Sequence, residues 1–261
     1  MDLVKITRFA DYLEKAVKIG HGVSPLTSLD SNFTVEEAYN VQLKTIERKV
    51  ADGAKIVGKK IGLTSLAMQK LLGVDQPDYG HLLDDMAVEN NGEISFARVL
   101  QPKAEAEIAF ILKRDLVGPR VTAHDVLMAT DYVLPALEIV DSRIADWKIK
   151  LEDTVADNAS SGLYVLGGRP VKPDQIDLVM AGMAFYKNGE LINTGVGAAA
   201  LGNPATCVAW LANKLFEFGI TLKAGEVILS GALSAAANAA PGDYFSARIA
   251  HLGEVGVRFT S

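Results

Sequence analysis

The stretch that most constrains the fold reads Gln101-Pro-Lys-Ala-Glu105-Ala-Glu107-Ile-Ala-Phe110. Successive side chains of a strand point to opposite faces, so this run predicts a strand with Glu105 and Glu107 on one face and Ala106 and Ile108 on the other. Carboxylates in so apolar a run are costly to bury unless a cation meets them. Two carboxylates held side by side repel each other, and a divalent cation would remove that repulsion.

A third carboxylate lies in a second apolar run, Val133-Leu-Pro-Ala-Leu-Glu138-Ile-Val-Asp141. Together with Glu105 and Glu107 it forms an all-oxygen set that suits a hard ion such as Mg²⁺ or Mn²⁺. The alternative is a solvated strand face, because carboxylates are seldom fully buried. The apolar neighbours of Glu138 favour the metal site.

Two helices are predicted before residue 54. Apolar residues recur at helical spacing from Leu3 to Val17, and Gly20 ends that pattern. Thr34-Val-Glu-Glu37 reads as a capping box that opens a second helix. Residues 1–53 are therefore predicted to form a helical N-terminal segment.

From about Lys55 short β-rich runs alternate with Gly, Pro and Asn. Residues 54–261 are accordingly predicted to form one domain with a mixed, largely antiparallel β core that contains the predicted metal site, which makes the fold class α+β. Helices are expected after Thr122, from Asn203-Pro204 to Gly219, and briefly over Ala67–Leu72, and turns at Gln76–Gly80 and Lys187–Glu190. The predicted strands are Lys55–Leu63, Glu105–Leu112, Tyr132–Val140, Gly162–Leu166, Leu178–Tyr186, Val227–Ser230, Tyr244–Ile249 and Gly256–Phe259.

Composition and charge exclude several classes of protein. The net charge is −6 over 261 residues and no block of Lys or Arg occurs, so neither nucleic acid nor an anionic membrane is an expected partner. A single Cys207 excludes an internal disulfide framework and fits a reducing cytoplasm. The first residues show no signal-peptide pattern, and no apolar run reaches about 18 residues. We therefore expect a cytoplasmic protein.

Outside the three glutamates, Lys60 is the main candidate for a residue that contacts a ligand. On a strand it shares a face with Gly58 and Gly62, which leaves open space around its ammonium group. Thr64 or Ser65 can then cap a short helix and present backbone amides to an anion. The alternative is that Lys60 and its neighbour Lys59 are ordinary lysines of an edge strand, which deter aggregation.

Five segments of the chain carry a resemblance to a known family. They are Gly58–Ser65, Gln76–Gly80, Pro102–Glu107, Pro135–Arg143 and Val155–Ala159. Together they resemble the 2-hydroxypenta-2,4-dienoate (2-oxopent-4-enoate) hydratases, which belong with the 4-oxalocrotonate decarboxylases to the fumarylacetoacetase-like superfamily. The resemblance runs in order over nearly the whole chain and includes the block Ala224–Gly231.

The resemblance implies a mixed β-roll around a divalent metal, Mg²⁺ or Mn²⁺, preceded by a helical segment. It implies an active-site lysine at Lys60 and, through Asp78, a hydratase, because the decarboxylases carry an apolar residue there. The alanine-rich loop Ser234–Asp243 is equally similar to the decarboxylases. The residues implied or proposed for the site are the metal ligands Glu105, Glu107 and Glu138, the catalytic residues Lys60 and Asp78, and the substrate-binding residues Thr64, Ser65 and Gly231.

The implied reaction adds water to 2-hydroxypenta-2,4-dienoate and gives 4-hydroxy-2-oxopentanoate, in meta-cleavage degradation of aromatic compounds. Lys60, partly desolvated near a dication, should have a lowered pKa and move protons. Asp78 should orient or deprotonate the attacking water. The family also implies a homo-oligomer that can associate with the partner decarboxylase.

Three alternatives stay open at this point. The first is 4-oxalocrotonate decarboxylase activity at the same metal site. The second is an acylpyruvate hydrolase, whose His/Glu pair would have to be His251 and Glu254, the one pair with H-x-x-E spacing. The third is a non-catalytic, metal-stabilised protein, against which Lys60 argues, because a structural site needs no open lysine.

Overall fold

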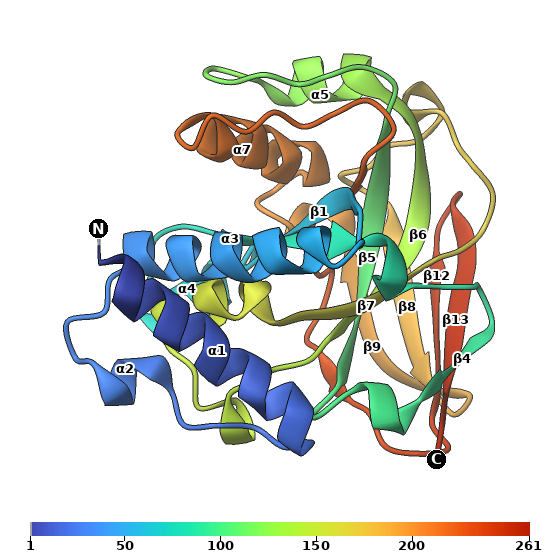
Figure 1. The fold of residues 1–261 in the computed structure, drawn as a ribbon. Coiled ribbons are helices and arrows are strands. Elements are labelled where there is room, and N and C mark those ends of the chain that lie inside the picture. Colours follow the sequence, from blue (N-terminus) through green and yellow to red (C-terminus); the bar gives the residue numbers. More distant parts are fainter. Residues whose placement is uncertain (1) are drawn as a thin grey trace.

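A computed structural model describes residues 2–261, with the side chains of Met68, Leu71 and Leu72 left out. Three helices near the N-terminus gather on one side of the molecule and most strands lie on the other (Figure 1). These helices are α1 (Leu3–Ile19), α2 (Leu26–Leu29) and α3 (Val35–Ala51).

The two predicted N-terminal helices are confirmed, together with the end of the first at Gly20 and the capping box of the second. The Asp2 side chain accepts the N–H groups of the first turn of α1, and Gly20 closes α1 in the left-handed conformation with φ 73°. Thr34 and Glu37 form the expected capping box of α3. Helix α1 packs on α3, and α3 packs on α6 (Leu151–Ala156), which the sequence did not predict.

The larger sheet has eight strands and carries the candidate site. Its order is β2-β1-β10-β5-β6-β7-β3, with β11 paired to β5. Most pairs are antiparallel, whereas β1 with β10 and β3 with β7 are parallel. The bounds are β1 Ile56–Gly62, β2 Asp78–Leu83, β3 Ala87–Val88, β5 Lys103–Leu112, β6 Thr130–Val140, β7 Ser161–Leu166, β10 Val227–Leu229 and β11 Ala237–Asn238.

The second sheet has five strands and packs against the first. Its order is β4-β13-β12-β8-β9, and strand β6 of the large sheet contacts both β12 and β13. The apolar core lies between the sheets and continues under α1 and α3. The bounds are β4 Gly92–Ser95, β8 Gly182–Lys187, β9 Glu190–Val196, β12 Tyr244–Ile249 and β13 Gly253–Thr260.

The later helices lie mostly where the sequence predicts them. They are α4 (Leu66–Leu72), α5 (Ala123–Ala129) and α7 (Pro204–Phe216), and α5 packs on α7 (Figure 1). The Asn203 side chain caps α7 by accepting the Ala205 N–H at 2.9 Å. Helix α7 ends three residues before the predicted Gly219.

Two predicted elements are wrong in part. Gln76–Gly80 was expected to be a turn, but β2 begins at Asp78 and pairs along its length with β1. The strand expected from Leu178 begins only at Gly182, because the Asp177 carboxylate accepts the N–H groups of Val179 and Met180 and turns the backbone there. The predicted turn at Lys187–Glu190 does connect β8 to β9.

The mixed, largely antiparallel α+β fold is confirmed, whereas the division at residues 53 and 54 stays a prediction. Helix α3 ends at Ala51 and β1 begins at Ile56. One continuous apolar cluster joins the helical segment to the sheets. Among residues 2–261, no helix has both the length and the apolar character needed to cross a membrane.

Candidate metal centre and active site

Glu105, Glu107 and Glu138 converge at one point of the large sheet. One carboxylate oxygen from each lies within 4.8 Å of those of the other two. In the β5–β6 register Glu105 lies directly opposite Glu138, while Glu107 faces Ala136 and is the diagonal neighbour of Glu138. The period of two along β5 and the register of β6 together create the cluster.

Burial makes this cluster unfavourable without a cation. Glu107 and Glu138 are 1% and 0% exposed, and Glu105 is half-buried. Among the described residues, Oε1 of Glu107 and Oε2 of Glu138 have no hydrogen-bond partner, and Oε1 of Glu138 has only the ammonium of Lys60, at 3.2 Å. Unpaired buried carboxylate oxygens of this kind fit the ligand set of a hard divalent ion.

The pKa values of all three glutamates are raised. Burial is the main cause for each; the nearby carboxylates of Glu138 and Glu105 add to it for Glu107. The pKa of Glu138 rises to about 7, because burial and Glu105 outweigh the opposing effect of Lys60. In the absence of a cation the cluster therefore holds protons that an ordinary glutamate would release.

Lys60 lies on β1 beside this cluster. It is 3% exposed, and its Nζ is 3.2 Å from Oε1 of Glu138. Burial lowers the pKa of Lys60, but Glu138, Asp78 and the other two glutamates raise it more, so the net shift is upward. This upward shift belongs to the metal-free protein, in which four carboxyl groups surround one ammonium; the lowered pKa expected for Lys60 beside a bound dication stays a prediction.

Lys59 points to the opposite face of the same strand. It is buried and its Nζ lies 3.0 Å from Oε1 of Glu226. Strand β1 lies between β2 and β10. The interpretation of Lys59 and Lys60 as ordinary edge-strand lysines is therefore wrong.

Asp78 joins the site because β2 pairs with β1. Asp78 lies opposite Gly62, and Gly80 lies opposite Lys60. A Cβ on Gly62 would collide with Oδ1 of Asp78, so the glycine provides the space that this carboxylate occupies. Burial raises the pKa of Asp78, while Lys60, the Gly62 N–H and the Thr154 side chain oppose that rise. The tertiary structure makes Asp78 a buried strand residue.

The three predicted substrate-binding residues have different surroundings. Thr64 is buried, and a Cβ on Gly231 would collide with its side chain. The Gly231 N–H donates to Oε2 of Glu107 at 2.8 Å, so this amide holds a glutamate in place. Ser65 is the N-cap residue of α4, but its side chain makes no capping hydrogen bond.

The turn Asn158–Ser160 packs against β2, the strand that carries Asp78, a contact that the sequence did not predict. All three residues have positive φ, at 55°, 51° and 53°, a conformation that costs about 1–2 kcal/mol per non-glycine residue. The Asn158 side chain accepts the His81 N–H at 2.7 Å and donates to the His81 carbonyl at 2.9 Å. These bonds fix the turn against β2, beside Asp78. Two features of the sequence could have indicated this contact. They are Asn158, a residue type that tolerates the left-handed conformation, and Gly80, which leaves room for a neighbouring backbone.

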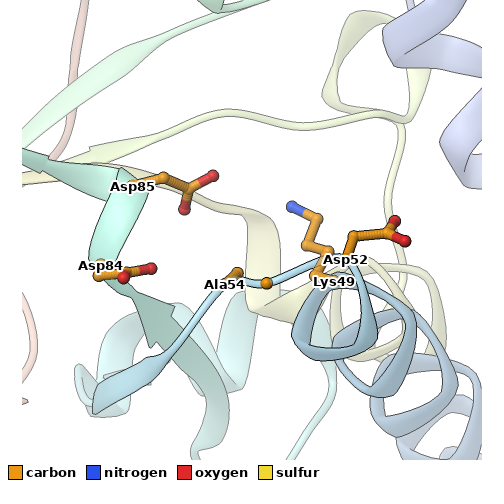
Figure 2. A pocket seen from close by; sticks show the side chains of 6 residues that line it. Lys49, Asp52, Ala54, Asp84 and Asp85 are labelled. Carbon is orange, nitrogen blue, oxygen red and sulfur yellow. The ribbon is translucent and has the colours of Figure 1, made fainter.

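Two surface pockets lie elsewhere on the molecule, one at the end of α3 and one at the β12–β13 hairpin. A pocket of about 480 Å³ lies between the end of α3 and the residues after β2, where Lys49 extends toward Asp85 (Figure 2). His251 and Glu254 lie at the β12–β13 hairpin, where Glu254 accepts a hydrogen bond from Arg248. The His/Glu pair of the hydrolase alternative is thus on the second sheet, away from the glutamates.

Comparison with known proteins agrees with this geometry. Residues 69–260 match the family model described as fumarylacetoacetate (FAA) hydrolase C-terminal. A 4-oxalocrotonate decarboxylase from Pseudomonas putida G7, solved with magnesium and adipate, is similar with a TM-score of 0.96 and 40% identity; the match covers 99% of this chain and 98% of that one. Fold and site thus define a member of the fumarylacetoacetate hydrolase class with a carboxylate cluster that could hold a metal.

The names of similar proteins indicate which family within this class the chain belongs to. A 2-hydroxypent-2,4-dienoate hydratase from Pseudomonas putida is 55% identical, over 84% of this chain and all of the relative. A 2-keto-4-pentenoate hydratase from Paraburkholderia xenovorans (strain LB400) is 48% identical, over 97% and 94% of the two chains. This chain belongs to the 2-keto-4-pentenoate hydratase family, whose members are hydro-lyases.

Proposed function

We propose that this protein is a divalent metal-dependent hydratase that converts 2-hydroxypenta-2,4-dienoate to 4-hydroxy-2-oxopentanoate. The observation that carries the proposal is the convergence of Glu105, Glu107 and Glu138 within 4.8 Å, next to Lys60 and Asp78. The names of the relatives support the substrate class.

The glutamate cluster fits a hard cation, and we propose Mg²⁺ or Mn²⁺. Glu105, Glu107 and Glu138 would hold it, with the Gly231 N–H orienting Glu107. A bound ion would supply Lewis acidity, which stabilises negative charge on the oxygens of a 2-hydroxy or 2-oxo acid. The magnesium in the decarboxylase structure supports this choice of ion.

The protein's own groups would carry out the proton transfers. Lys60 would help to move the proton of the 2-hydroxyl group while C5 of the dienol gains a proton, which gives an α,β-unsaturated 2-oxo acid. Asp78 would then accept a proton from water as the water oxygen forms its bond to C4. C3 would gain the last proton and the product is 4-hydroxy-2-oxopentanoate. The two groups lie on paired strands, so their separation is set by the sheet.

A direct assay tests the proposal. Purified protein with Mg²⁺ would be given the dienol and, separately, 4-oxalocrotonate, and both hydroxy-keto acid and carbon dioxide would be followed. We expect hydration of the dienol that stops in excess EDTA and returns with Mg²⁺ or Mn²⁺. Carbon dioxide release from 4-oxalocrotonate without hydration of the dienol would contradict the proposal.

The second candidate is 4-oxalocrotonate decarboxylase activity. The similarity to the solved decarboxylase over nearly the whole chain favours it, and both reactions need a stabilised enolate. Asp78 favours hydration, because only hydration needs a water activated at C4. The cytoplasmic location, the meta-cleavage pathway, the homo-oligomer and the complex with a decarboxylase stay predictions.

A further inference from the structure

The two fully buried glutamates of the cluster each have one carboxylate oxygen engaged and one left over. The Gly231 N–H donates to Oε2 of Glu107 at 2.8 Å, and Oε1 of Glu107 has no hydrogen-bond partner among the described residues. In Glu138 the engaged oxygen is Oε1, which lies 3.2 Å from Nζ of Lys60, and Oε2 has no partner in the same part of the chain. Each of these glutamates therefore presents a single unpaired oxygen to the cluster.

Ser230 fixes the amide of Gly231 relative to Glu107. Ser230 is fully buried directly after β10, and its N–H and its hydroxyl both donate to the Ile108 carbonyl of β5, at 3.1 Å and 2.8 Å. Ile108 follows Glu107 in the chain, so the donor Gly231 and the acceptor Glu107 are joined through adjacent positions on two strands. This short connection leaves the amide little freedom to move away from the carboxylate.

Thr64 packs against Gly231 and explains why a glycine is needed there. Gly231 has φ 102°, a backbone conformation that only glycine adopts without steric cost. A Cβ on Gly231 would lie 2.5 Å from Cγ2 of Thr64 and closer still to its Oγ1. Thr64 is 3% exposed, and its carbonyl accepts the Leu201 N–H at 3.1 Å, which ties it to the segment before α7. A side chain at position 231 would therefore push the amide away from Glu107.

We propose that Gly231, Ser230 and Thr64 are positioning residues that restrict Glu107 to one metal-binding oxygen, Oε1, and so make the centre select Mg²⁺ over Ca²⁺. This inference rests on the proposed metal-dependent function. Ca²⁺ accepts both oxygens of one carboxylate in a large, flexible ligand set, whereas Mg²⁺ needs an octahedral set at shorter distances. Carboxylates that give one oxygen each leave positions of such a set for water and for substrate.

The test is Gly231→Ala, with calorimetric titration of the metal-free protein by Mg²⁺ and, separately, by Ca²⁺. Displacement of the amide should lower Mg²⁺ affinity about ten- to a hundredfold, the usual effect of losing a hydrogen bond that orients a metal ligand. Ca²⁺ affinity should fall by less than about threefold, because the released Oε2 of Glu107 becomes a further ligand that Ca²⁺ can use. A general loss of stability would not change the ratio of the two affinities in this way.

A double variant tests the contact with Thr64. The three atoms nearest to a Cβ on Gly231 all belong to Thr64, and Thr64→Gly removes them. In the double variant Gly231→Ala/Thr64→Gly the amide can stay in place, so Mg²⁺ affinity should lie within about threefold of that of Thr64→Gly alone. An equally large loss from Gly231→Ala in both backgrounds would overturn the role given to Thr64.

Gly225→Ala is the matched control for the backbone conformation. Gly225 has φ 87° and lies just before β10, but a Cβ there meets nothing within 4 Å. This variant should lose some stability and keep both metal affinities. Unchanged affinities in Gly231→Ala, or equal losses for Mg²⁺ and Ca²⁺, would overturn the inference.

Two further outcomes separate the inference from the proposed function. An unmodified protein that binds Ca²⁺ as tightly as Mg²⁺ would overturn the inference while the proposed function stands. If the unmodified protein binds neither ion, the proposed metal-dependent function itself fails. Should Gly231→Ala not fold, Ser230→Ala decides by the same titrations, because it removes the hydroxyl that holds the amide to β5. We expect a smaller loss of Mg²⁺ affinity there, with the ratio changed in the same direction.

Discussion

Glu107 combines complete burial with one satisfied and one unsatisfied carboxylate oxygen. Replacing it by Gln keeps the shape and removes the charge, so we expect affinity for Mg²⁺ to fall at least about tenfold, or about 1.4 kcal/mol. Turnover should be lost with it, while the metal-free variant stays folded because the core is large. Calorimetric titration with Mg²⁺ and the hydration assay measure both. The exposed Glu254→Gln serves as control, and normal turnover of Glu107→Gln would contradict the metal site.

Lys60 and Lys59 lie on opposite faces of β1, so the same substitution should have different consequences. Lys60→Met should lose roughly a hundred- to ten-thousandfold in kcat, as expected for loss of a general acid or base. Lys59→Met should keep kcat per folded molecule, but it removes the ammonium that pairs with Oε1 of Glu226. We expect that variant to lose about 3 kcal/mol of stability. Urea unfolding and steady-state kinetics on both variants separate the two effects, and a greater kinetic loss in Lys59→Met would show that the assignment of roles is wrong.

Asp78 is the residue that should be needed for hydration but not for decarboxylation. Asp78→Asn keeps size and most hydrogen bonding but removes the base, so we expect formation of 4-hydroxy-2-oxopentanoate to stop. Ketonisation of the dienol should survive in part, because the metal ligands and Lys60 remain. Following both products in one reaction by NMR measures this split. A variant that is less stable but has full specific activity would mean that Asp78 is only structural.

At the scale of elements, the contact between β2 and the Asn158–Ser160 turn is the most sensitive to a small change. A Cβ on Gly80 would collide with the Asn158 carbonyl oxygen, which is backbone and cannot move away cheaply. We expect Gly80→Ala to destabilise the protein by about 1–3 kcal/mol and to reduce hydration by displacing the turn. Gly182→Ala is the matched control, because a Cβ there meets nothing within 4 Å. Equal urea midpoints for the two variants would argue against a tight β2–turn contact.

At the scale of the whole molecule, the buried glutamates couple stability to pH and to metal. The pKa of Glu138 is about 7 in the metal-free fold and lies near the ordinary glutamate value in the unfolded chain. The folded state therefore binds the additional proton, and the metal-free protein should lose stability as pH rises from about 5 to above 7. Metal ions need the deprotonated carboxylates, so the stabilisation by Mg²⁺ should grow over the same range. Thermal unfolding at pH 5.5 and 8, with and without Mg²⁺, checks this; a Mg²⁺ effect that does not change with pH would contradict it.

Much of the local structure was predictable because it depends on neighbouring residues alone. The caps at Asp2, Thr34 and Asn203 are satisfied within one helical turn, and their side chains can be recognised without the rest of the fold. The period of two along β5 likewise places Glu105 and Glu107 on one face. Strand β2 was not predicted because a glycine at position 80 suggests a turn. In the structure Gly80 instead lets the Asn158 backbone approach the strand.

The sequence by itself determined the helical N-terminal segment, the β-rich remainder and the three glutamates that are too costly to bury unpaired. Only the tertiary structure decided that Glu138 stands opposite Glu105 and that Asp78 lies opposite Gly62. The physical reason is the range of the interactions. Periodicity and capping act over a few residues, whereas strand register and the docking of α6 depend on packing between segments far apart in the chain, which leaves no local pattern in the sequence.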